Sequence, residues 1–261
     1  MTATATEEWN HWTEARTASV TAPHGQLALT GTHWLDSEPI EISGLPGLWW
    51  ASEGLVRLRA KADDDIRIKG AEAPVDGEVA LRPDTARSPD LAELGERLLA
   101  PIEREGELAL RVFDPDSARR AAFAGITVYP YAPEWAVPAV FTPFEAEKTV
   151  SVPNADGRER PLEVTGQISF TLAGEPHTLT VSRAGRWLSG VISDATSGSD
   201  TYRFRFITLP EPDESGHTVL DLNRAHLPPC AFSDHYICPF PPPDNRLTIA
   251  VEAGEKQVLS R

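Results

Sequence analysis

The chain alternates apolar and polar residues with a period of two in several short stretches, which is typical of strands with one buried face. In residues 168–172, Ile168, Phe170 and Leu172 alternate with polar residues, and a turn at 173–174 leads into a second such stretch. Similar alternation occurs in residues 56–59, 66–69, 202–206 and 247–251. Because these stretches follow one another without helix-length crossovers, the pattern predicts a mainly β fold of antiparallel sheets closed as a sandwich or barrel.

Local signals predict how some of these stretches connect. Three consecutive aspartates at 63–65 indicate a turn that would pair residues 56–59 with 66–69 as a hairpin. In residues 88–105 the leucines have helical spacing, but Gly95 and Pro101 interrupt it, so we expect a loop that could include one turn of helix. The polar stretch 210–217 is expected to be an exposed loop.

One helix, at about residues 5–20, is predicted near the start of the chain. Thr4 and Glu7 have the spacing of a capping box, and Trp9 and Trp12 then fall on one stripe of the helix. Pro23 follows where the helix should end. We expect both indoles to pack on the body of the protein.

No fixed-period repeat and no clear linker divides the sequence. We therefore predict a single domain over residues 1–261, with the helix at about 5–20, a β body over 26–252 and a distinctive loop at 221–246 within it.

That distinctive loop, which we call the signature loop (residues 221–246), contains six prolines between 228 and 243. Proline cannot serve the centre of a sheet, yet the loop is too rich in apolar and aromatic residues for a disordered linker. A long apolar loop inside a compact domain is usually ordered and functional. We expect a rigid wall that closes over a polar hollow on the sheet.

Composition excludes several classes of function. With 24 Lys and Arg against 39 Asp and Glu, the net charge is −15 and no basic cluster offsets it, so we expect no nucleic-acid or membrane partner. The start of the chain has no basic, apolar leader, and no stretch is long and apolar enough to span a membrane, which predicts a cytoplasmic protein. No GxGxxG, P-loop, HExxH or CxxC motif is present, so no cofactor is predicted.

Two Asn-Arg pairs in the signature loop are candidate ligand-binding residues. Arginine grips carboxylate or phosphate through paired hydrogen bonds, so Arg224 and Arg246 could anchor a small acid together with Asn223 and Asn245. The alternative is structural, because each arginine could pair with a nearby acidic residue and pin the loop to the sheet.

The two cysteines suggest a second kind of chemistry. Cys230 and Cys238 could act as nucleophiles beside a histidine such as His226. Together with His235 they also offer four potential metal ligands, although seven residues separate the cysteines and the flanking prolines restrict their convergence. The alternative is that both are small buried apolar residues in a reducing compartment.

The polar turn at residues 194–201 is a further candidate. Asp194 lies at the end of a predicted strand, where it could act as a general base or orient a ligand. The structural alternative is a hairpin turn whose short polar side chains bond to the backbone.

Four blocks of the sequence resemble an uncharacterised bacterial family, domain of unknown function 1684. They are APHGQLALTGTHWLD, RVFDPDSARRAAFAGITVYP, SDATSGSDTYRFRF and the long block NRAHLPPCAFSDHYICPFPPPDNRL followed by EAGEK. The resemblance implies one shared architecture over most of the chain and a shared pocket. It includes both cysteines and both Asn-Arg pairs but not His235, and the family name implies no activity.

Three hypotheses follow. The first is binding of a small, anionic metabolite under the signature loop, with or without catalysis. The second is a metal- or thiol-dependent enzyme that uses Cys230, Cys238 and His226, and the third is a structural or partner-binding module. The sequence leaves the reaction, the substrate and the oligomeric state open.

Overall fold

A computed structural model describes residues 4–261. In these residues the strands of every sheet pair antiparallel, and strands make up most of the regular secondary structure. The predicted mainly β class is therefore confirmed. The described chain groups into two compact units, one of residues 19–121 and one formed by residues up to 18 together with residues 122–261. The single domain over residues 1–261 stays a prediction, because two compact units can still fold as one domain.

The unit of residues 19–121 is a sandwich of two antiparallel sheets. Its core contains inward-facing residues of both sheets, with Trp49 fully buried among them, as expected for facing layers. One sheet has the order β1 (Leu29–Leu35), β9 (Glu107–Phe113), β8 (Arg97–Arg104), β7 (Ala92–Leu94) and β5 (Ile66–Ile68). The other has the order β2 (Ile40–Ile42), β3 (Leu45–Ser52), β4 (Leu55–Ala60) and β6 (Gly77–Leu81), and a short helix α2 (Ala118–Ala122) follows.

The other unit is built on a six-stranded sheet that curls toward a barrel. The first and last strands of its order, β15 and β16, also contact each other. The order is β15 (Arg205–Leu209), β14 (Trp187–Ile192), β13 (Glu175–Ala184), β12 (Glu159–Leu172), β11 (Ala136–Pro153) and β16 (His217–Asp221). A separate pair joins β10 (Phe123–Val128) to β17 (Glu255–Ser260).

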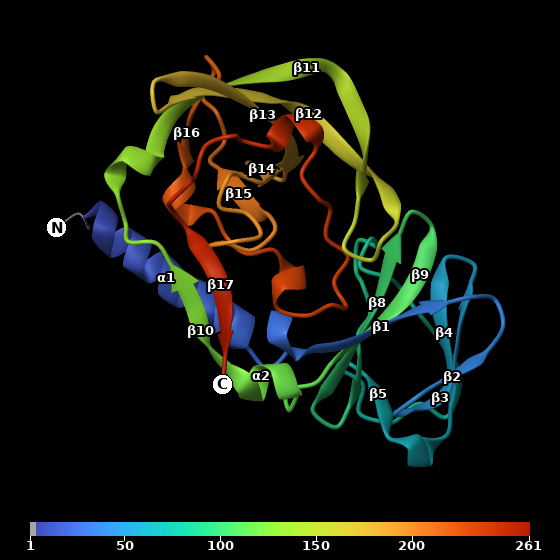
Figure 1. Ribbon diagram of the computed structural model, residues 1–261. Helices are drawn as coiled ribbons and strands as arrows, with labels where there is room; N and C mark the ends of the chain where they lie inside the picture. Colours follow the sequence, from blue (N-terminus) through green and yellow to red (C-terminus); the bar gives the residue numbers. More distant parts are fainter. Residues whose placement is uncertain (1–3) are drawn as a thin grey trace. The chain divides into compact units, whose positions relative to one another are not determined.

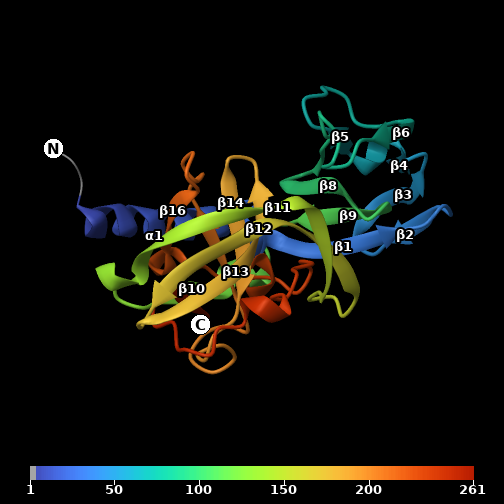
Figure 2. The same ribbon diagram turned by 90° about the horizontal axis from the view of Figure 1, so that it is seen from above.

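The chain after β16 fills the inside of this curl. Figure 1 shows the orange and red C-terminal part of the ribbon within the bend of β11, β12 and β13, and Figure 2 shows these three strands from above. Leu222, Ala225, Leu247 and Val251 belong to the same buried cluster as the inward residues of the strands. The signature loop is thus ordered, but much of it forms the core of this unit.

Helix α1 (Ala5–Thr21) confirms the predicted N-terminal helix and its cap. The backbone N–H of Glu7 donates to Thr4 Oγ1 at 3.3 Å, and that of Thr4 donates to Glu7 Oε2 at 2.6 Å. The tryptophans pack as expected, since Trp9 Nε1 donates to the Asn223 carbonyl at 3.0 Å and Trp12 lies edge-on to the His226 ring.

Two predicted connections are wrong. Residues 56–59 and 66–68 lie in strands, but β4 pairs with β3 and β6 while β5 pairs with β7, because the turn at 63–65 carries the chain from one sheet to the other. Residues 88–105 are not a loop. They contain β7 and β8, joined by a tight turn at Gly95, whose φ of +59° glycine adopts without strain.

Residues 247–251 were predicted to form a strand and do not. Their burial does alternate, with Leu247 and Val251 facing inward, but no neighbouring strand pairs with them. They lie inside the curl, where their backbone forms hydrogen bonds with the turn after β14. One example is the N–H of Ala195, which donates to the carbonyl of Ile249 at 3.0 Å. The strand predicted at 202–206 begins at Arg205.

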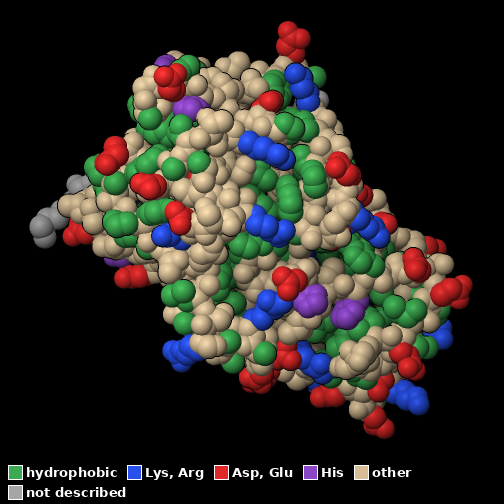
Figure 3. All heavy atoms as spheres, viewed as in Figure 1, with side chains coloured by type: hydrophobic (Ala, Val, Ile, Leu, Met, Phe, Trp, Pro, Cys, Tyr) green, Lys and Arg blue, Asp and Glu red, His purple; other side chains and the backbone are tan. Residues whose placement is uncertain are grey.

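Acidic and basic side chains are interspersed over the face shown in Figure 3. Among the residues that the structure describes, no helix combines the length and apolar character that crossing a membrane requires.

Candidate functional site

The asparagines of the two Asn-Arg pairs hold the signature loop in place. Asn245 Oδ1 accepts from the N–H of Thr180 at 2.7 Å, and its Nδ2 donates to the carbonyls of Thr180 and Val191 at 2.8 and 2.9 Å. Asn223 forms the same kind of two-way contact with the backbone of Ala132, at 3.0 and 2.9 Å. Both amides are buried and substitute for a peptide group, so their bonding capacity serves the fold.

The two arginines that follow lie in different surroundings. Arg224 lines a pocket, where its Nε lies 3.2 Å from Asp221 Oδ2 and its Nη2 lies 3.9 Å from Glu8 Oε2. Arg246 is exposed and is not part of the lining of that pocket. The structure therefore does not bring the two predicted anchors together.

Asp194 is part of a buried ion pair. Its Oδ2 accepts from Arg205 Nη2 at 2.7 Å, and both side chains are fully shielded from solvent. Its Oδ1 accepts from the N–H and hydroxyl of Thr196 and from the N–H of Val251. Although burial raises the pKa of this carboxyl, Arg205 and Thr196 lower it more, so the pKa lies below its ordinary value.

The same network extends along the C-terminal segment. Arg205 also donates to the carbonyls of Val251 and Ala253, which places a charged hydrogen-bonding centre between β15 and the chain inside the curl. Each oxygen of Asp194 is thus engaged with the protein, which favours an anchoring role over the general base considered from the sequence.

The two cysteines lie side by side below Tyr202. The N–H of Cys230 donates to Cys238 Sγ at 3.3 Å, and Tyr202 Oη donates to the Cys230 carbonyl at 3.1 Å and to its Sγ at 3.6 Å. Neither forms a disulfide, and both are buried. In residues 4–261, no group of three or more His, Cys, Asp or Glu side chains is arranged to hold a metal ion. His235 is exposed.

A concave site of about 430 Å³ lies where α1 meets β14, β15 and β16, and we call it the tryptophan pocket. Trp187 and Val219 are among the exposed large apolar residues, at 41% and 46% exposure, and both line it. Its full lining is Trp12, Trp187, Thr208, Pro210, Val219, Asp221, Arg224 and His226. A mostly apolar hollow of this size with a few convergent polar groups is the usual form of a small-molecule site.

His226 lies at the floor of this pocket in a largely desolvated position. Its Nδ1 is 3.2 Å from the carbonyl of Arg224, which can only accept, so Nδ1 carries the proton and Nε2 is an acceptor. Burial, followed by the charge of Arg16, lowers the pKa of His226 to about 4. The imidazole is therefore neutral near pH 7.

Arg16 and Glu255 join α1 to the segment below the pocket. Arg16 Nε donates to Glu255 Oε1 at 2.9 Å, and Glu255 Oε2 accepts from the N–H of Leu227 at 2.7 Å. The buried Glu255 carboxylate therefore binds both α1 and the signature loop. It holds in place the helix on which the pocket residue Trp12 lies.

A smaller hollow of about 220 Å³ shares Thr208 and His226 with the tryptophan pocket. It lies between the sheet and the signature loop, which contributes Pro239 and Asn245 to its lining. A hollow below the loop was predicted, and the Arg224 guanidinium belongs to the outer pocket and not to this inner one.

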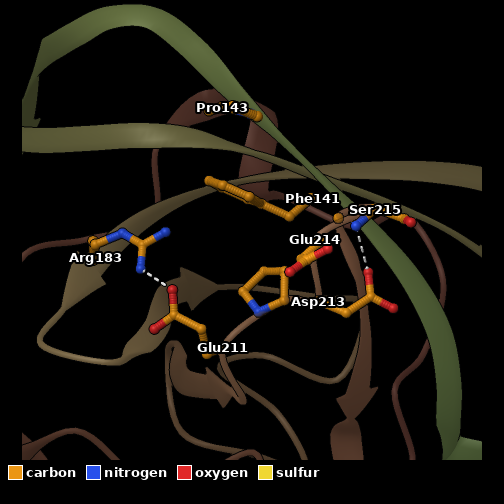
Figure 4. A pocket seen from close by; sticks show the side chains of 9 residues that line it. Phe141, Pro143, Arg183, Glu211, Asp213, Glu214 and Ser215 are labelled. Carbon is orange, nitrogen blue, oxygen red and sulfur yellow. Dashed lines mark hydrogen bonds and ion pairs between the residues drawn. The ribbon is translucent and has the colours of Figure 1, made fainter.

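Figure 4 shows another pocket, formed around the loop between β15 and β16. Arg183 pairs with Glu211 there, and Asp213 accepts from the N–H groups of Ser215 and His217. These bonds are those of an exposed turn, in agreement with the loop predicted at 210–217.

Four pocket residues were not predicted from the sequence: Trp187, Thr208, Pro210 and Val219. A signal was present for two of them, because Trp187-Leu188 and Val219-Leu220 each place two apolar residues in succession. One member of such a pair must face outward on a strand, and Leu188 and Leu220 are the buried members.

Comparisons with known proteins assign no activity to this arrangement. A family model described as protein of unknown function (DUF1684) matches residues 121–256, which include the whole lining of the tryptophan pocket except Trp12. No curated protein matches the chain. Among solved structures, an uncharacterized protein from Haloarcula marismortui, studied by solution NMR, is 33% identical, and the match covers 51% of this chain and 77% of that chain with a TM-score of 0.43.

Proposed function

Because the chain belongs to a family of proteins of unknown function, DUF1684, whose description names no activity, we propose a function from the pocket itself. The tryptophan pocket binds a small molecule that has a planar apolar body and an anionic group. Arg224 meets the anion, and Trp12 and Trp187 contact the planar body.

The state of Arg224 carries this proposal. Its guanidinium lies beside Asp221 and Glu8, while within residues 4–261 its buried Nε makes no hydrogen bond to the protein. Guanidinium donors are strong and planar, and they suit a carboxylate or phosphate that offers two acceptors. A ligand anion would supply the hydrogen bonds that the ion pairs leave unmade.

The apolar part of the lining supports a planar body. Trp187 is held on a strand, and the guanidinium of Arg186 lies 5.3 Å from its ring centroid, which adds a second cation near the pocket. Rings stack on tryptophan with a gain beyond the buried area alone. His226, neutral near pH 7, offers Nε2 as an acceptor, and its low pKa makes it a weak general base, so the lining favours binding over acid–base catalysis.

A cytoplasmic location and the absence of nucleic-acid partners stay predictions. The net charge of −15 supports the second of these, because it opposes binding to phosphate backbones.

Binding of naphthoate, measured by titration calorimetry and compared with neutral naphthamide, tests the proposal. We expect naphthoate to bind more tightly, and Arg224→Ala to weaken its binding by about tenfold or more, as loss of a charged hydrogen bond would. Trp187→Ala should weaken both probes by about threefold to tenfold through lost stacking.

Arg246→Ala is the matched control, because Arg246 also follows a clamping asparagine but lies outside the pocket. It should bind both probes as the parent does. If naphthoate fails to bind at millimolar concentration, or binds Arg224→Ala as tightly as the parent, the proposal is wrong.

A further inference from the structure

The two thiols form a contact pair that the proposed binding function does not use. The N–H of Cys230 donates to Cys238 Sγ at 3.3 Å, so the sulfur of one residue lies against the backbone of the other. They lie eight positions apart in the signature loop, and both belong to a small buried cluster with Val191 and Phe204. Tyr202 and Tyr236 pack against this cluster.

A chain of donors leads from the surface to Cys230. Arg203, which is exposed, donates from Nη2 to Tyr202 Oη at 3.1 Å. The single hydroxyl proton of Tyr202 is shared between the Cys230 carbonyl at 3.1 Å and Cys230 Sγ at 3.6 Å. The guanidinium lies over the rings of Tyr202 and Phe240, at 5.3 and 5.0 Å from their centroids, which holds it in this position. Its positive charge and the phenol both favour a negative charge on the sulfur.

The electrostatics agree with this geometry. A hydrogen bond from the Cys238 thiol, together with Tyr202 and Arg203 and against the effect of burial, lowers the pKa of Cys230 to about 7. Burial raises the pKa of Tyr202 to about 12, so the phenol keeps its proton and continues to donate. The titratable or charged groups around Cys230 are thus Cys238, Tyr202, Arg203 and the neighbouring Tyr236.

We propose that Cys230 and Cys238 are a peroxide-reactive dithiol, in which Cys230 is the attacking thiolate and Cys238 resolves the product to a disulfide. Only 5% of Cys230 and 3% of Cys238 is exposed, which suits an oxidant as small as hydrogen peroxide. Arg203 and Tyr202 are positioning residues that stabilise the thiolate.

The reaction balances with hydrogen peroxide as the only oxidant. The Cys230 thiol first releases its proton to solvent; the thiolate Sγ then attacks one peroxide oxygen, the S–O bond forms and the O–O bond breaks, and the departing hydroxide takes up a proton from solvent and leaves as water. Cys238 Sγ then attacks Cys230 Sγ, the S–S bond forms, the S–O bond breaks, and a second water leaves with the Cys238 proton. The dithiol loses two electrons and the peroxide gains them.

Intact mass spectrometry of the reduced full-length protein tests the proposal. After hydrogen peroxide treatment, alkylation with N-ethylmaleimide and denaturation, the parent should lose two hydrogens and take up no maleimide. In Cys238→Ala the Cys230 sulfenic acid should persist and be trapped by dimedone. In Cys230→Ala, Cys238 should stay reduced and be fully alkylated.

The pH dependence of the oxidation rate separates an activated thiolate from two buried thiols. The parent rate should rise with a midpoint near pH 7 and not near the ordinary value of 9.0, so at pH 7 the thiolate fraction is about fiftyfold higher than for an ordinary thiol. Arg203→Gln and Tyr202→Phe should move the midpoint upward. Arg59→Gln is the control, since Arg59 lies over Trp50 at 5.3 Å in the other unit and should leave the midpoint unchanged.

Thermal unfolding shows whether each variant is folded before it is used. If both thiols of the folded parent are still alkylated after peroxide treatment that oxidises glutathione, the proposal is wrong. It is also wrong if oxidation gives only crosslinks between molecules, or if the midpoint is the same in the parent and in Arg203→Gln.

Discussion

Replacement of Asp194 by alanine should destabilise the unit that contains β11–β16 by about 3–5 kcal/mol, the cost of leaving one partner of a buried ion pair without its counter-charge. The two side chains are both fully shielded from solvent, and Asp194 also accepts bonds from Thr196 and Val251. In urea unfolding, this loss corresponds to a midpoint lower by about 2 M for a typical denaturant slope. Tryptophan fluorescence and circular dichroism would follow the transition.

The exposed pair of Arg183 and Glu211 is the matched control. Its side chains are 42% and 47% exposed, so Glu211→Ala should cost less than about 1 kcal/mol. The double variant Asp194→Asn with Arg205→Met removes both charges, and asparagine keeps the size of Asp194 and an acceptor for Thr196 and Val251. It should recover much of the stability lost in Asp194→Ala, since the cost lies in the uncompensated charge.

Two outcomes would refute this reasoning. The loss of stability in Asp194→Ala could be less than about 1 kcal/mol, as for a surface ion pair, or the double variant Asp194→Asn with Arg205→Met could be no more stable than Asp194→Ala. The pH dependence gives an independent check. Because the folded-state pKa of Asp194 is lowered, its contribution is complete above the unfolded value of 3.8 and is lost as the pH falls through the lower folded value.

Two further predictions concern the chain inside the curl. Gly254→Ala should lower the free energy of unfolding by about 1–3 kcal/mol, because Gly254 has a φ of +79° and an added Cβ would lie 2.4 Å from the Ala225 carbonyl oxygen. Urea unfolding measures this loss. The control is Gly44→Ala, which has the same φ but open space around the added Cβ and should lose less stability. The pKa of His226 is about 4 in the folded state and 6.5 in the unfolded state, so the free energy of unfolding should fall as the pH drops from 6.5 to 4. His226→Gln should make the stability nearly independent of pH in that range. A variant with the same pH dependence as the parent would contradict the low folded pKa.

The class of the fold was predictable because alternation reports one buried face per strand. The β12–β13 hairpin is the clearest case, since Ile168, Phe170 and Leu172 are all buried and the turn falls at the predicted residues. Alternation says nothing about the neighbour of a strand, so the wrong partner was assigned to β4 and β5. It also cannot separate a strand from an irregular segment in a curl, as Leu247 and Val251 demonstrate.

The candidate site was predictable only in part. The sequence marked Arg224 through its residue type, and the structure places it at a pocket. The same reasoning marked Arg246, which is exposed, because residue type does not encode the direction in which a side chain points. Trp187 and Trp12 meet at this pocket from positions far apart in the chain, and no local pattern contains that contact.

The polar residues of the signature loop have a common physical cause. Once the segment lies inside a curled sheet without a strand partner, its buried backbone groups need other hydrogen-bonding partners. Prolines reduce the number of N–H groups to satisfy. Asn223 and Asn245 bond instead to backbone groups of the segments that pack against the loop, at Ala132 and Thr180, and Asp194 accepts from the N–H of Val251 just after the loop. Polar residues in an irregular core segment are therefore best assigned to backbone satisfaction first. By that criterion Arg224, whose guanidinium lines a pocket and whose buried Nε makes no hydrogen bond to the described residues, is the member of the original set that points to a ligand.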